Sequence, residues 1–288
     1  MKKIYISDLD GTLLRNDATL SEYSRKSLTR LINNDIKFTV ASARSMYSME
    51  EILGDLPLKL PVIEFNGAFI TDYETGEHIV INNIENEVCP ELLKLLMEHD
   101  YIPYISSYDG IKNNLYYEKI NNYGMQWYLE DRIKAKDKRL KQVNNIQKVL
   151  NEYIICFTIM NKKEKLFELA QYLETRYKDI LEIHLMDNQY SPGWYWLSMY
   201  DKKATKDSAI KRLIKIEGLE GYETVVFGDN VNDIKMFKGS DKAIAVENAK
   251  DELKIHATDI IGKNEADSVV DFILKDVYED EKELQTAY

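Results

Sequence analysis

Several features are scarce in this sequence of 288 residues, and each scarcity excludes a class of protein. Two cysteines are present, Cys89 and Cys156, without any Cys-X-X-Cys pair, so we predict two small buried side chains and neither a disulfide framework nor a zinc site. No apolar run is long enough to cross a membrane, and aspartates interrupt the N-terminal segment where a signal peptide needs apolar residues. These absences predict a cytoplasmic protein.

Basic residues are outnumbered by acidic ones. The chain has 38 Lys and Arg against 49 Asp and Glu, a formal net charge of −11. Because phosphate backbones are bound by concentrated positive charge, we predict no nucleic-acid partner, and we also expect no membrane partner. The local basic stretch from Lys134 to Lys141 is interpreted as the solvated face of a helix. The composition leaves the oligomeric state open.

The order of strand and helix patterns predicts two domains. Apolar strands alternate with amphipathic helices over the first 80 residues, with a third strand and a turn expected at residues 61–70, and the alternation returns after residue 202. Such a rhythm predicts a parallel sheet covered by helices, whereas the Tyr-rich segments between predict antiparallel pairing. We therefore predict an α/β fold: a Rossmann-like, doubly wound parallel sheet core from residues 1–82 and 201–288, with residues 83–200 inserted as an α+β domain. A last helix is expected at residues 269–275, and residues 279–288 are expected to be a frayed end.

Acidic and polar residues follow three of the predicted core strands. In chain order they are Asp8, Asp10 and Thr12, then Ser42 and Arg44, then Asp229, Asn232 and Asp233. Ligands bind open parallel sheets beyond the carboxyl ends of the strands, where these residues would meet. The pattern therefore predicts one site at one rim of the sheet.

Four aspartates at one rim need a cation, because like charges held close together raise each other's pKa and are costly to bury. Ligation by oxygen atoms alone favours Mg²⁺ or a similar hard ion. A calcium-binding loop starting at Asp8 is the competing interpretation. That loop requires Glu at its twelfth position, which is Thr19 in this sequence.

Lys206 suggests that an anion would bind beside the cation. This lysine stands at the start of a predicted helix, whose amide groups and positive dipole end favour an anion. Hydroxyl and backbone donors after Gly11 and around Ser42 would add to the same site. Together they predict a phosphate site, in which an aspartate can attack phosphorus directly and form an aspartyl-phosphate.

The segments DLDGT, SAR, Lys206 and GDNVND, in that order, resemble the four motifs of the haloacid dehalogenase (HAD) superfamily of phosphatases. The insert between the second and third motifs resembles the α/β cap of its Cof-like subgroup. NGA at Asn66–Ala68 and AIAVENA near the end also fit that subgroup. The resemblance covers nearly the whole chain.

The resemblance implies a role for each matching residue. Asp8 would be the nucleophile and a metal ligand, and Asp10 the general acid and base that also ligates Mg²⁺ through its backbone carbonyl. Asp229 would complete the protein ligands, and Asp233 would support them. The phosphoryl group would be held by Ser42, Ala43, Lys206 and Asn232.

Two positions depart from the pattern. Ala43 stands where the family usually has Gly, which keeps the backbone donor unless a positive φ is needed. Asp207 follows the lysine where Gly is common, and Lys202 and Lys203 are rivals for the phosphate-binding role. We prefer Lys206 because Ala209, Leu213 and Ile214 follow it with helical spacing.

The predicted function is a Mg²⁺-dependent phosphatase acting on a small phosphorylated metabolite, such as a phosphosugar. Two alternatives stay open: a phosphosugar mutase, which returns the phosphoryl group to its substrate, and a regulatory module that accepts phosphate on Asp8. The sequence does not name the substrate. Aromatic residues of the insert are candidates for pocket or core: Tyr104, Tyr108, Tyr116, Tyr117, Trp194 and Trp196.

Overall fold

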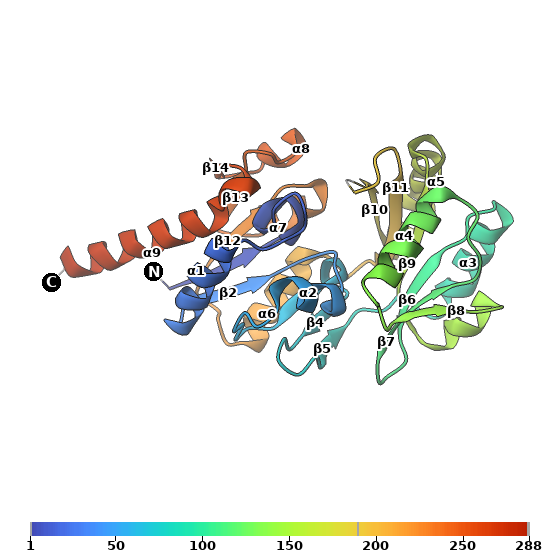
Figure 1. Cartoon of the computed structure of the whole chain (residues 1–288), viewed down its shortest axis with the longest axis horizontal. Coiled ribbons are helices and arrows are strands. Elements are labelled where there is room, and N and C mark those ends of the chain that lie inside the picture. Colours follow the sequence, from blue (N-terminus) through green and yellow to red (C-terminus); the bar gives the residue numbers. More distant parts are fainter. Residues whose placement is uncertain (1, 189, 287–288) are drawn as a thin grey trace. The chain divides into compact units, whose positions relative to one another are not determined.

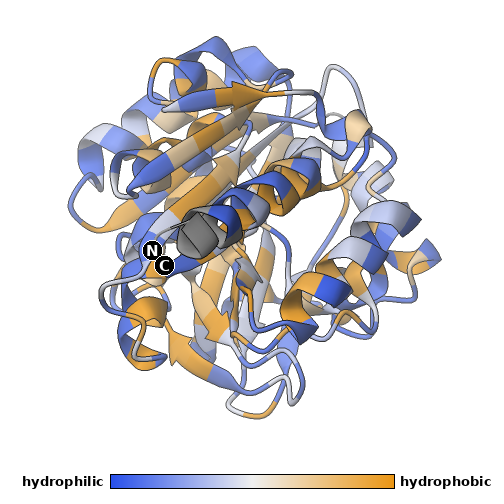
Figure 2. Ribbon diagram, turned by 90° about the vertical axis from the view of Figure 1, so that its left-hand side faces the viewer, coloured by the Kyte–Doolittle hydropathy of each residue, from blue (hydrophilic) through white to orange (hydrophobic). Residues whose placement is uncertain are grey.

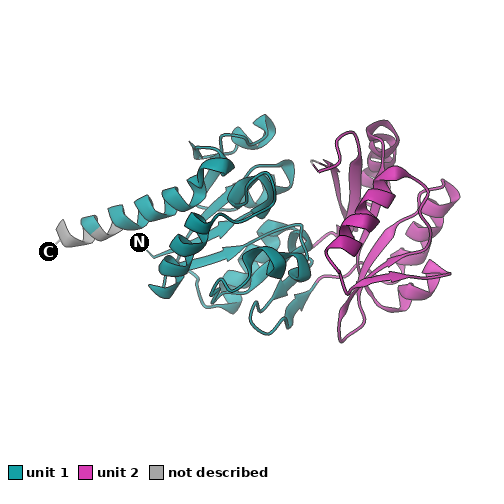
Figure 3. Cartoon of the chain, viewed as in Figure 1, with its two compact units in different colours: residues 1–81, 205–288 teal, residues 82–204 magenta. Residues whose placement is uncertain are grey.

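The structure, a computed structural model, describes residues 2–188 and 190–286. The chain divides into two compact units (Figure 3). Unit 1 joins the residues up to 81 with those from 205 onwards, and unit 2 consists of residues 82–204. Unit 2 therefore begins one residue before the predicted insert and ends four residues after it. Within the described residues, no helix combines the length and apolar character needed to span a lipid bilayer.

Unit 1 is built on a five-stranded parallel sheet in the order β14-β13-β12-β1-β2 (Figure 1). Its strands are β1 (Lys3–Ser7), β2 (Lys37–Val40), β12 (Glu223–Gly228), β13 (Lys242–Val246) and β14 (Asp259–Ile261). Strand β1 is an inner strand, because it pairs with β12 on one side and with the edge strand β2 on the other. The N-terminal and C-terminal parts of the chain thus form one sheet, which confirms the predicted parallel α/β core.

Helices follow the strands of unit 1. They are α1 (Glu22–Asn33), α2 (Met46–Leu53), α6 (Lys206–Ile216), α7 (Ile234–Lys238), α8 (Asp251–Lys254) and α9 (Ser268–Thr286). Helix α1 contacts α9, and α6 contacts α7. Hydrophobic residues concentrate on the strands, whereas the helices carry both hydrophilic and hydrophobic residues (Figure 2). Strands β1, β2, β12 and β13 are buried at every residue except the first, as expected for parallel strands covered on both faces.

A second, three-stranded antiparallel sheet lies within unit 1. It consists of β3 (Val62–Glu64), β4 (Phe69–Thr71) and β5 (His78–Ile81). The segment from Pro61 to Ile70 was expected to be a third core strand with a turn. Instead β3 meets the main sheet through one parallel bridge, Ala41 to Ile63, and the chain then reverses into β4. The reversal is made by Phe65, Asn66 and Gly67, which all have positive φ.

Unit 2 is an α+β unit with a six-stranded sheet in the order β10-β11-β9-β6-β7-β8. The strands are β6 (Tyr104–Tyr108), β7 (Asn113–Tyr117), β8 (Leu140–Gln142), β9 (Tyr153–Asn161), β10 (Leu181–Asp187) and β11 (Tyr195–Asp201). The helices are α3 (Val88–Glu98), α4 (Tyr123–Lys134) and α5 (Lys163–Arg176). Tyr104 and Tyr116 are buried in its apolar clusters, so these two aromatic residues belong to the core. Both cysteines are also buried, as predicted.

Two local interpretations of the sequence were wrong. The basic stretch from Lys134 to Lys141 is not a helix face, because α4 ends at Lys134 and the chain enters β8 at Leu140. The predicted frayed end is helical as far as Thr286, since α9 continues well past Lys275, and the last two residues lie outside the described part.

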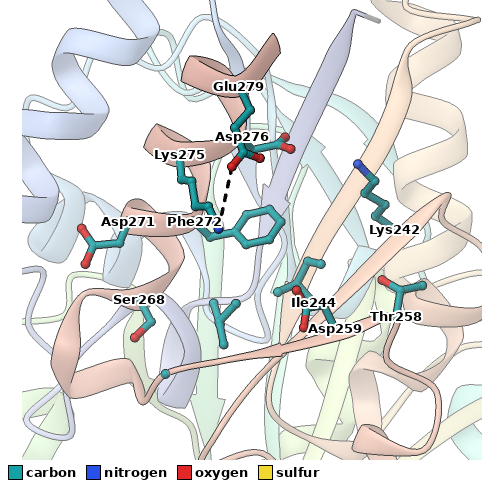
Figure 4. A pocket seen from close by; sticks show the side chains of 12 residues that line it. Lys242, Ile244, Thr258, Asp259, Ser268, Asp271, Phe272, Lys275, Asp276 and Glu279 are labelled. Atoms are coloured by element: carbon teal, nitrogen blue, oxygen red, sulfur yellow. Dashed lines mark ion pairs between the residues drawn. The ribbon is translucent and has the colours of Figure 1, made fainter. Parts of the chain in front are cut away.

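A surface groove of about 660 Å³ lies in unit 1 beside α9, β13 and β14 (Figure 4). Its lining includes Ile244, Phe272 and the ion pair between Lys275 and Glu279, whose charged atoms are 3.8 Å apart. The lining contains none of the residues predicted for the phosphate site.

Candidate active site

Asp8 lies at the carboxyl end of the inner strand β1. Its backbone N–H donates to the carbonyl of Phe227 at 3.0 Å, which continues the β1–β12 pairing by one residue. The side chain is buried, with 6% of the residue exposed. The strand therefore places an aspartate in an interior position where its charge needs a partner.

Lys206 provides that partner. Its Nζ donates to Asp8 Oδ1 and to Asp233 Oδ1, both at 2.6 Å, and its side chain is fully buried. Lys206 is the first residue of α6, and Thr205 before it has the extended backbone of a helix N-cap. Of its predicted rivals, Lys202 instead pairs with Glu182 of unit 2 at 3.4 Å. The geometry brings Lys206 to the aspartates, as expected from its helical spacing.

Asp229 and Asp233 arrive from the loop after β12. Asp233 Oδ2 accepts from the backbone N–H groups of Asp229 at 3.0 Å and Asn230 at 3.2 Å, which closes a tight turn. Thr12 Oγ1 donates to Asp229 Oδ1 at 3.3 Å. Three carboxylates, those of Asp8, Asp229 and Asp233, each place an oxygen within 4.8 Å of the others. This all-oxygen set fits a hard divalent cation better than a softer metal.

Burial and the charges of neighbouring groups shift the pKa values of Asp8, Asp229 and Lys206. Burial, opposed by Lys206 and reinforced by Asp233, raises the pKa of Asp8 to about 7. Burial and the neighbouring Asp8 and Asp233 raise the pKa of Asp229 to about 9. Burial alone would lower the pKa of Lys206, but Asp233 and Asp8 outweigh it and hold that pKa above its ordinary value. One ammonium group thus faces three carboxylates, an imbalance that a divalent cation would correct.

Asp10 is turned to a different partner. Both of its carboxylate oxygens accept from Arg44, one from Nε at 2.7 Å and one from Nη2 at 2.6 Å. Arg44 Nη1 also donates to Ser48 Oγ at 2.8 Å, which ties the guanidinium to α2. Arg44 was expected at the rim, but no role was predicted for it. Its position two residues after Ser42, at the rim where Asp10 was also expected, is the signal that could have suggested one.

The SAR segment is hydrogen-bonded to β3 and to the β3–β4 turn. Ser42 is buried, its backbone N–H donates to Ile63, and its carbonyl accepts from the N–H of Asn66 at 2.9 Å. Ser42 Oγ accepts from the backbone N–H of Arg44 at 3.1 Å. Ala43 does not have a positive φ, so Ala in place of the family's usual Gly introduces no strain there.

Asn232 also reaches this turn. Its Nδ2 donates to Asn66 Oδ1 at 3.0 Å, while its own Oδ1 is buried and accepts no hydrogen bond from the residues that the structure describes. A buried acceptor of this kind is costly unless a ligand or water satisfies it. All eight residues predicted for the site lie in unit 1 on the loops after β1, β2 and β12 or at the start of α6.

Comparisons with known proteins agree with this arrangement. The sequence profile of the haloacid dehalogenase-like hydrolases matches residues 5–273. A provisionally named phosphatase of Buchnera aphidicola subsp. Baizongia pistaciae is 30% identical over 279 residues, which are 96% of this chain and 98% of that protein. The 5-amino-6-(5-phospho-D-ribitylamino)uracil phosphatase YwtE of Bacillus subtilis is 27% identical over 292 residues, 95% of this chain and 97% of that one. A crystal structure from Thermotoga maritima is similar with a TM-score of 0.75, at 25% identity, covering 94% of this chain and 96% of its own. The predicted resemblance is therefore confirmed, and this chain belongs to the haloacid dehalogenase-like hydrolase family.

Proposed function

We propose that this protein is a magnesium-dependent phosphatase that hydrolyses a small phosphorylated metabolite through an aspartyl-phosphate on Asp8. The broader class, a phosphoric monoester hydrolase, follows from the family and its phosphatase relatives. The observation that carries the proposal is the buried carboxylate of Asp8 held by Lys206 beside Asp229 and Asp233. This arrangement combines a nucleophile with cationic stabilisation of a phosphoryl group.

The metal-binding residues in this proposal are Asp8, Asp229 and the backbone carbonyl of Asp10, with Asp233 supporting them. A bound Mg²⁺ supplies positive charge that offsets the charge on the transferring phosphoryl oxygens. Lys206 adds its ammonium group, and Ser42, Ala43 and Asn232 offer hydrogen-bonding groups to the phosphate. The Asn232 side-chain oxygen, which finds no donor within the described residues, supports an occupant that carries a donor, such as water or a protonated phosphate oxygen.

The reaction has two steps. In the first, an oxygen of Asp8 forms a bond to phosphorus, the bond from phosphorus to the alcohol oxygen breaks, and Asp10 gives its proton to that oxygen. In the second, water gives a proton to Asp10 while its oxygen attacks phosphorus, and the bond between phosphorus and Asp8 breaks. The products are the alcohol and inorganic phosphate, with both aspartates restored.

The substrate class is the least constrained part of the proposal. One relative is named for a substrate with a phosphorylated ribityl chain, which supports a phosphorylated polyhydroxyl compound for this chain. We assign unit 2 the role of a specificity-determining cap. A screen of phosphate release over phosphosugars, phosphorylated polyols and phosphorylated cofactors tests the substrate class.

Asp8→Asn tests the central claim. It should lower the rate of nitrophenyl phosphate hydrolysis by about a thousandfold or more, because the amide is a poor nucleophile. Asp35→Asn is the matched control, since Asp35 is an exposed partner of Lys59 away from the site and should keep full activity. Turnover above a few per cent in Asp8→Asn would place the attacking group elsewhere.

Metal dependence is tested separately on the unaltered protein. EDTA should stop phosphate release and Mg²⁺ should restore it, whereas an excess of Ca²⁺ should inhibit because its coordination is larger and looser. Full activity in the chelator would contradict the metal assignment. Net release of inorganic phosphate from a phosphosugar, in place of an isomeric phosphosugar, distinguishes the phosphatase from a mutase.

A further inference from the structure

Two asparagine side chains hold the turn that follows Asp8. Asn248 Nδ2 donates to the carbonyl oxygen of Gly11 at 2.7 Å, and Asn248 Oδ1 accepts from the backbone N–H of Asn264 at 3.0 Å. One neighbour is an acceptor only and the other a donor only, so the orientation of the Asn248 amide is determined by its surroundings. We call the side chains of Asn248 and Asn264 the asparagine clasp.

Asn264 holds the end of the same turn. Its Nδ2 donates to the carbonyl of Leu14 at 2.9 Å and to Asn16 Oδ1 at 3.0 Å. The residue is buried, with 3% exposed, so these bonds are shielded from water. The turn itself runs from Leu9 to Leu13, and the N–H of Leu14 donates back to Leu9 at 2.9 Å. The asparagine clasp therefore donates hydrogen bonds to both the middle and the end of the segment that carries Asp10.

The turn from Leu9 to Leu13 lies against Asp229, a predicted metal ligand. Gly11 has φ +73°, and a Cβ atom at this position would collide with the carboxylate of Asp229. Asp10 and Gly11 have the backbone angles of a type II turn, which requires a residue tolerant of positive φ at the second position. Thr12, the next residue, donates to Asp229. A small shift of this turn would therefore move Asp10, Thr12 and Asp229 together.

The segment that carries Asn248 also holds the loop after β12. The backbone N–H of Lys250 donates to the carbonyl of Asp229 at 2.8 Å. Residues 248–250 thus contact both the turn after β1 and the residue that follows β12. Neither Asn248 nor Asn264 is among the residues predicted for the site.

We propose that Asn248 and Asn264 are positioning residues, which set the spacing between the Asp10 turn and Asp229 and thereby the metal affinity and turnover of the site. This rests on the proposed function, because it assigns Asp10 and Asp229 to the metal. Asn248 is exposed, so its truncation removes a tether without opening a cavity. Partners that orient metal ligands typically change affinity or activity by about 10–100-fold when removed.

The experiment compares the full chain with three variants. Asn248→Ala removes both bonds, and Asn248→Asp keeps the shape but places an oxygen against the Gly11 carbonyl. Glu247→Ala is the matched control, since Glu247 is the exposed neighbour of Asn248. Mg²⁺ binding to each protein is measured by calorimetry with the metal alone, and kcat and KM are measured with nitrophenyl phosphate at saturating Mg²⁺.

Both Asn248 variants should bind Mg²⁺ about tenfold more weakly and lose about tenfold in kcat, with KM and the melting temperature nearly unchanged. Glu247→Ala should match the unaltered protein in every measurement. Mg²⁺ affinity and kcat within twofold of the unaltered protein in both Asn248 variants would overturn the proposal. A rise in KM with unchanged kcat and Mg²⁺ affinity would also overturn it, because that result assigns Asn248 to substrate binding.

Asn264→Ala adds a further readout. Loss of its buried bonds should increase hydrogen exchange at the amides of Leu14 and Asn16 as well as weaken Mg²⁺ binding. Unchanged exchange and Mg²⁺ affinity would contradict its role. If the unaltered protein binds Mg²⁺ but hydrolyses no phosphate ester, the proposed function fails, while calorimetry on the Asn248 variants still tests the clasp.

Discussion

The contact between Asp10 and Arg44 gives the two neighbouring aspartates of the DLDGT segment different environments. Asp8 is buried and faces Lys206, whereas Asp10 receives two parallel hydrogen bonds from a guanidinium. Such a bidentate pair fixes the orientation of a carboxylate as well as its charge. Arg44 therefore holds Asp10 as an ionised carboxylate apart from the three clustered carboxylates, so an acid role requires Asp10 to leave Arg44 and take up a proton.

Asp10→Asn should separate acid catalysis from nucleophilic attack. If Asp10 protonates the leaving oxygen, its loss should reduce kcat/KM far more for an alkyl phosphate than for a nitrophenyl ester, whose leaving group needs little proton assistance. Steady-state kinetics with both esters measures the difference. Equal losses on both would refute the acid role.

A double-mutant cycle then tests Arg44. Arg44→Lys keeps the charge but cannot reproduce the forked contact, so it should reduce alkyl phosphate hydrolysis on its own. In the Asp10→Asn background it should cost little more, because its partner is already altered. Full additivity would mean that Arg44 acts independently of Asp10.

The raised pKa values of Asp8 and Asp229 predict how stability depends on pH. Their ordinary pKa is 3.8, and folding raises it to about 7 for Asp8 and about 9 for Asp229. The native protein then binds more protons than the unfolded chain between these values. Their contribution to stability is fully present below the ordinary pKa and is lost as the pH rises through the folded values. In EDTA, the melting temperature should therefore fall as the pH is raised from 5 to 9.

Mg²⁺ should reverse this fall. Because the cation binds the ionised carboxylates, the increase in melting temperature that it produces should be larger at high pH than at pH 5. Thermal unfolding with Mg²⁺ or EDTA across this range measures both effects. Asp229→Asn should flatten the pH dependence. A Mg²⁺ effect that is greatest at acid pH would contradict the assignment.

At the scale of elements, the β3–β4 turn sets the position of α6. Gly67 has φ +108°, and a Cβ atom there would collide with the backbone of Thr205, immediately before Lys206. The carbonyl of Thr205 accepts the first hydrogen bond of α6, from Ala209 at 3.0 Å. The approach of these two segments therefore depends on the absence of a side chain at residue 67.

Gly67→Ala should be destabilising by about 2 kcal/mol or more, since it combines unfavourable φ with a backbone collision. It should also lower kcat, because the start of α6 carries Lys206. Gly76→Ala is the control, because Gly76 has φ +73° with open space around it and should lose only about 1 kcal/mol. Urea denaturation compares the two. Similar losses in both variants would show that the contact with Thr205 is unimportant.

The elements that carry the site were predictable. Apolar strands followed by aspartate, serine or glycine indicate a parallel sheet with polar residues at the carboxyl ends of its strands. The missed elements lack such patterns. Helix α4 buries only Gly124 and Met125 completely, so it has little apolar periodicity to detect. Strands β8 and β14 have three residues each, and their pairing is set by neighbours distant in sequence. The position of Arg44 after Ser42 predicts that it lies at the rim, but its pairing with Asp10 depends on side-chain direction across two loops, which the sequence pattern does not encode.

At the scale of the whole molecule, each unit has a core of its own. The largest apolar cluster of unit 1 contains residues from both ends of the chain, and the clusters of unit 2 lie entirely between Ile84 and Met199. The helices of unit 2 also lie within residues 82–204, and its six strands pair with one another within the same range. This organisation predicts a separately folding unit.

Residues 82–204 expressed alone should fold cooperatively. Circular dichroism should give a mixed helix and strand spectrum, and urea should produce a single unfolding transition. Leu173→Ala, which removes a fully buried side chain of this unit, should lower the midpoint, by about 2–5 kcal/mol of stability. A gradual loss of signal without a transition would mean that the segment needs the rest of the chain.

The position of β1 between β12 and β2 also determines the order in which the sheet can form while the chain is synthesised. β1 is among the first segments to be synthesised, and it obtains β2 early, but its other partner β12 begins only at Glu223. Lys206, Asp229 and Asp233 emerge after all of unit 2, so a growing chain carries Asp8 for most of its synthesis without the groups that face it. Unit 2 can complete its sheet during that interval, whereas β1 keeps an open edge. The proposed catalytic centre is accordingly among the last parts of the protein to form, and a chain that ends before Lys206 lacks the cation that faces Asp8.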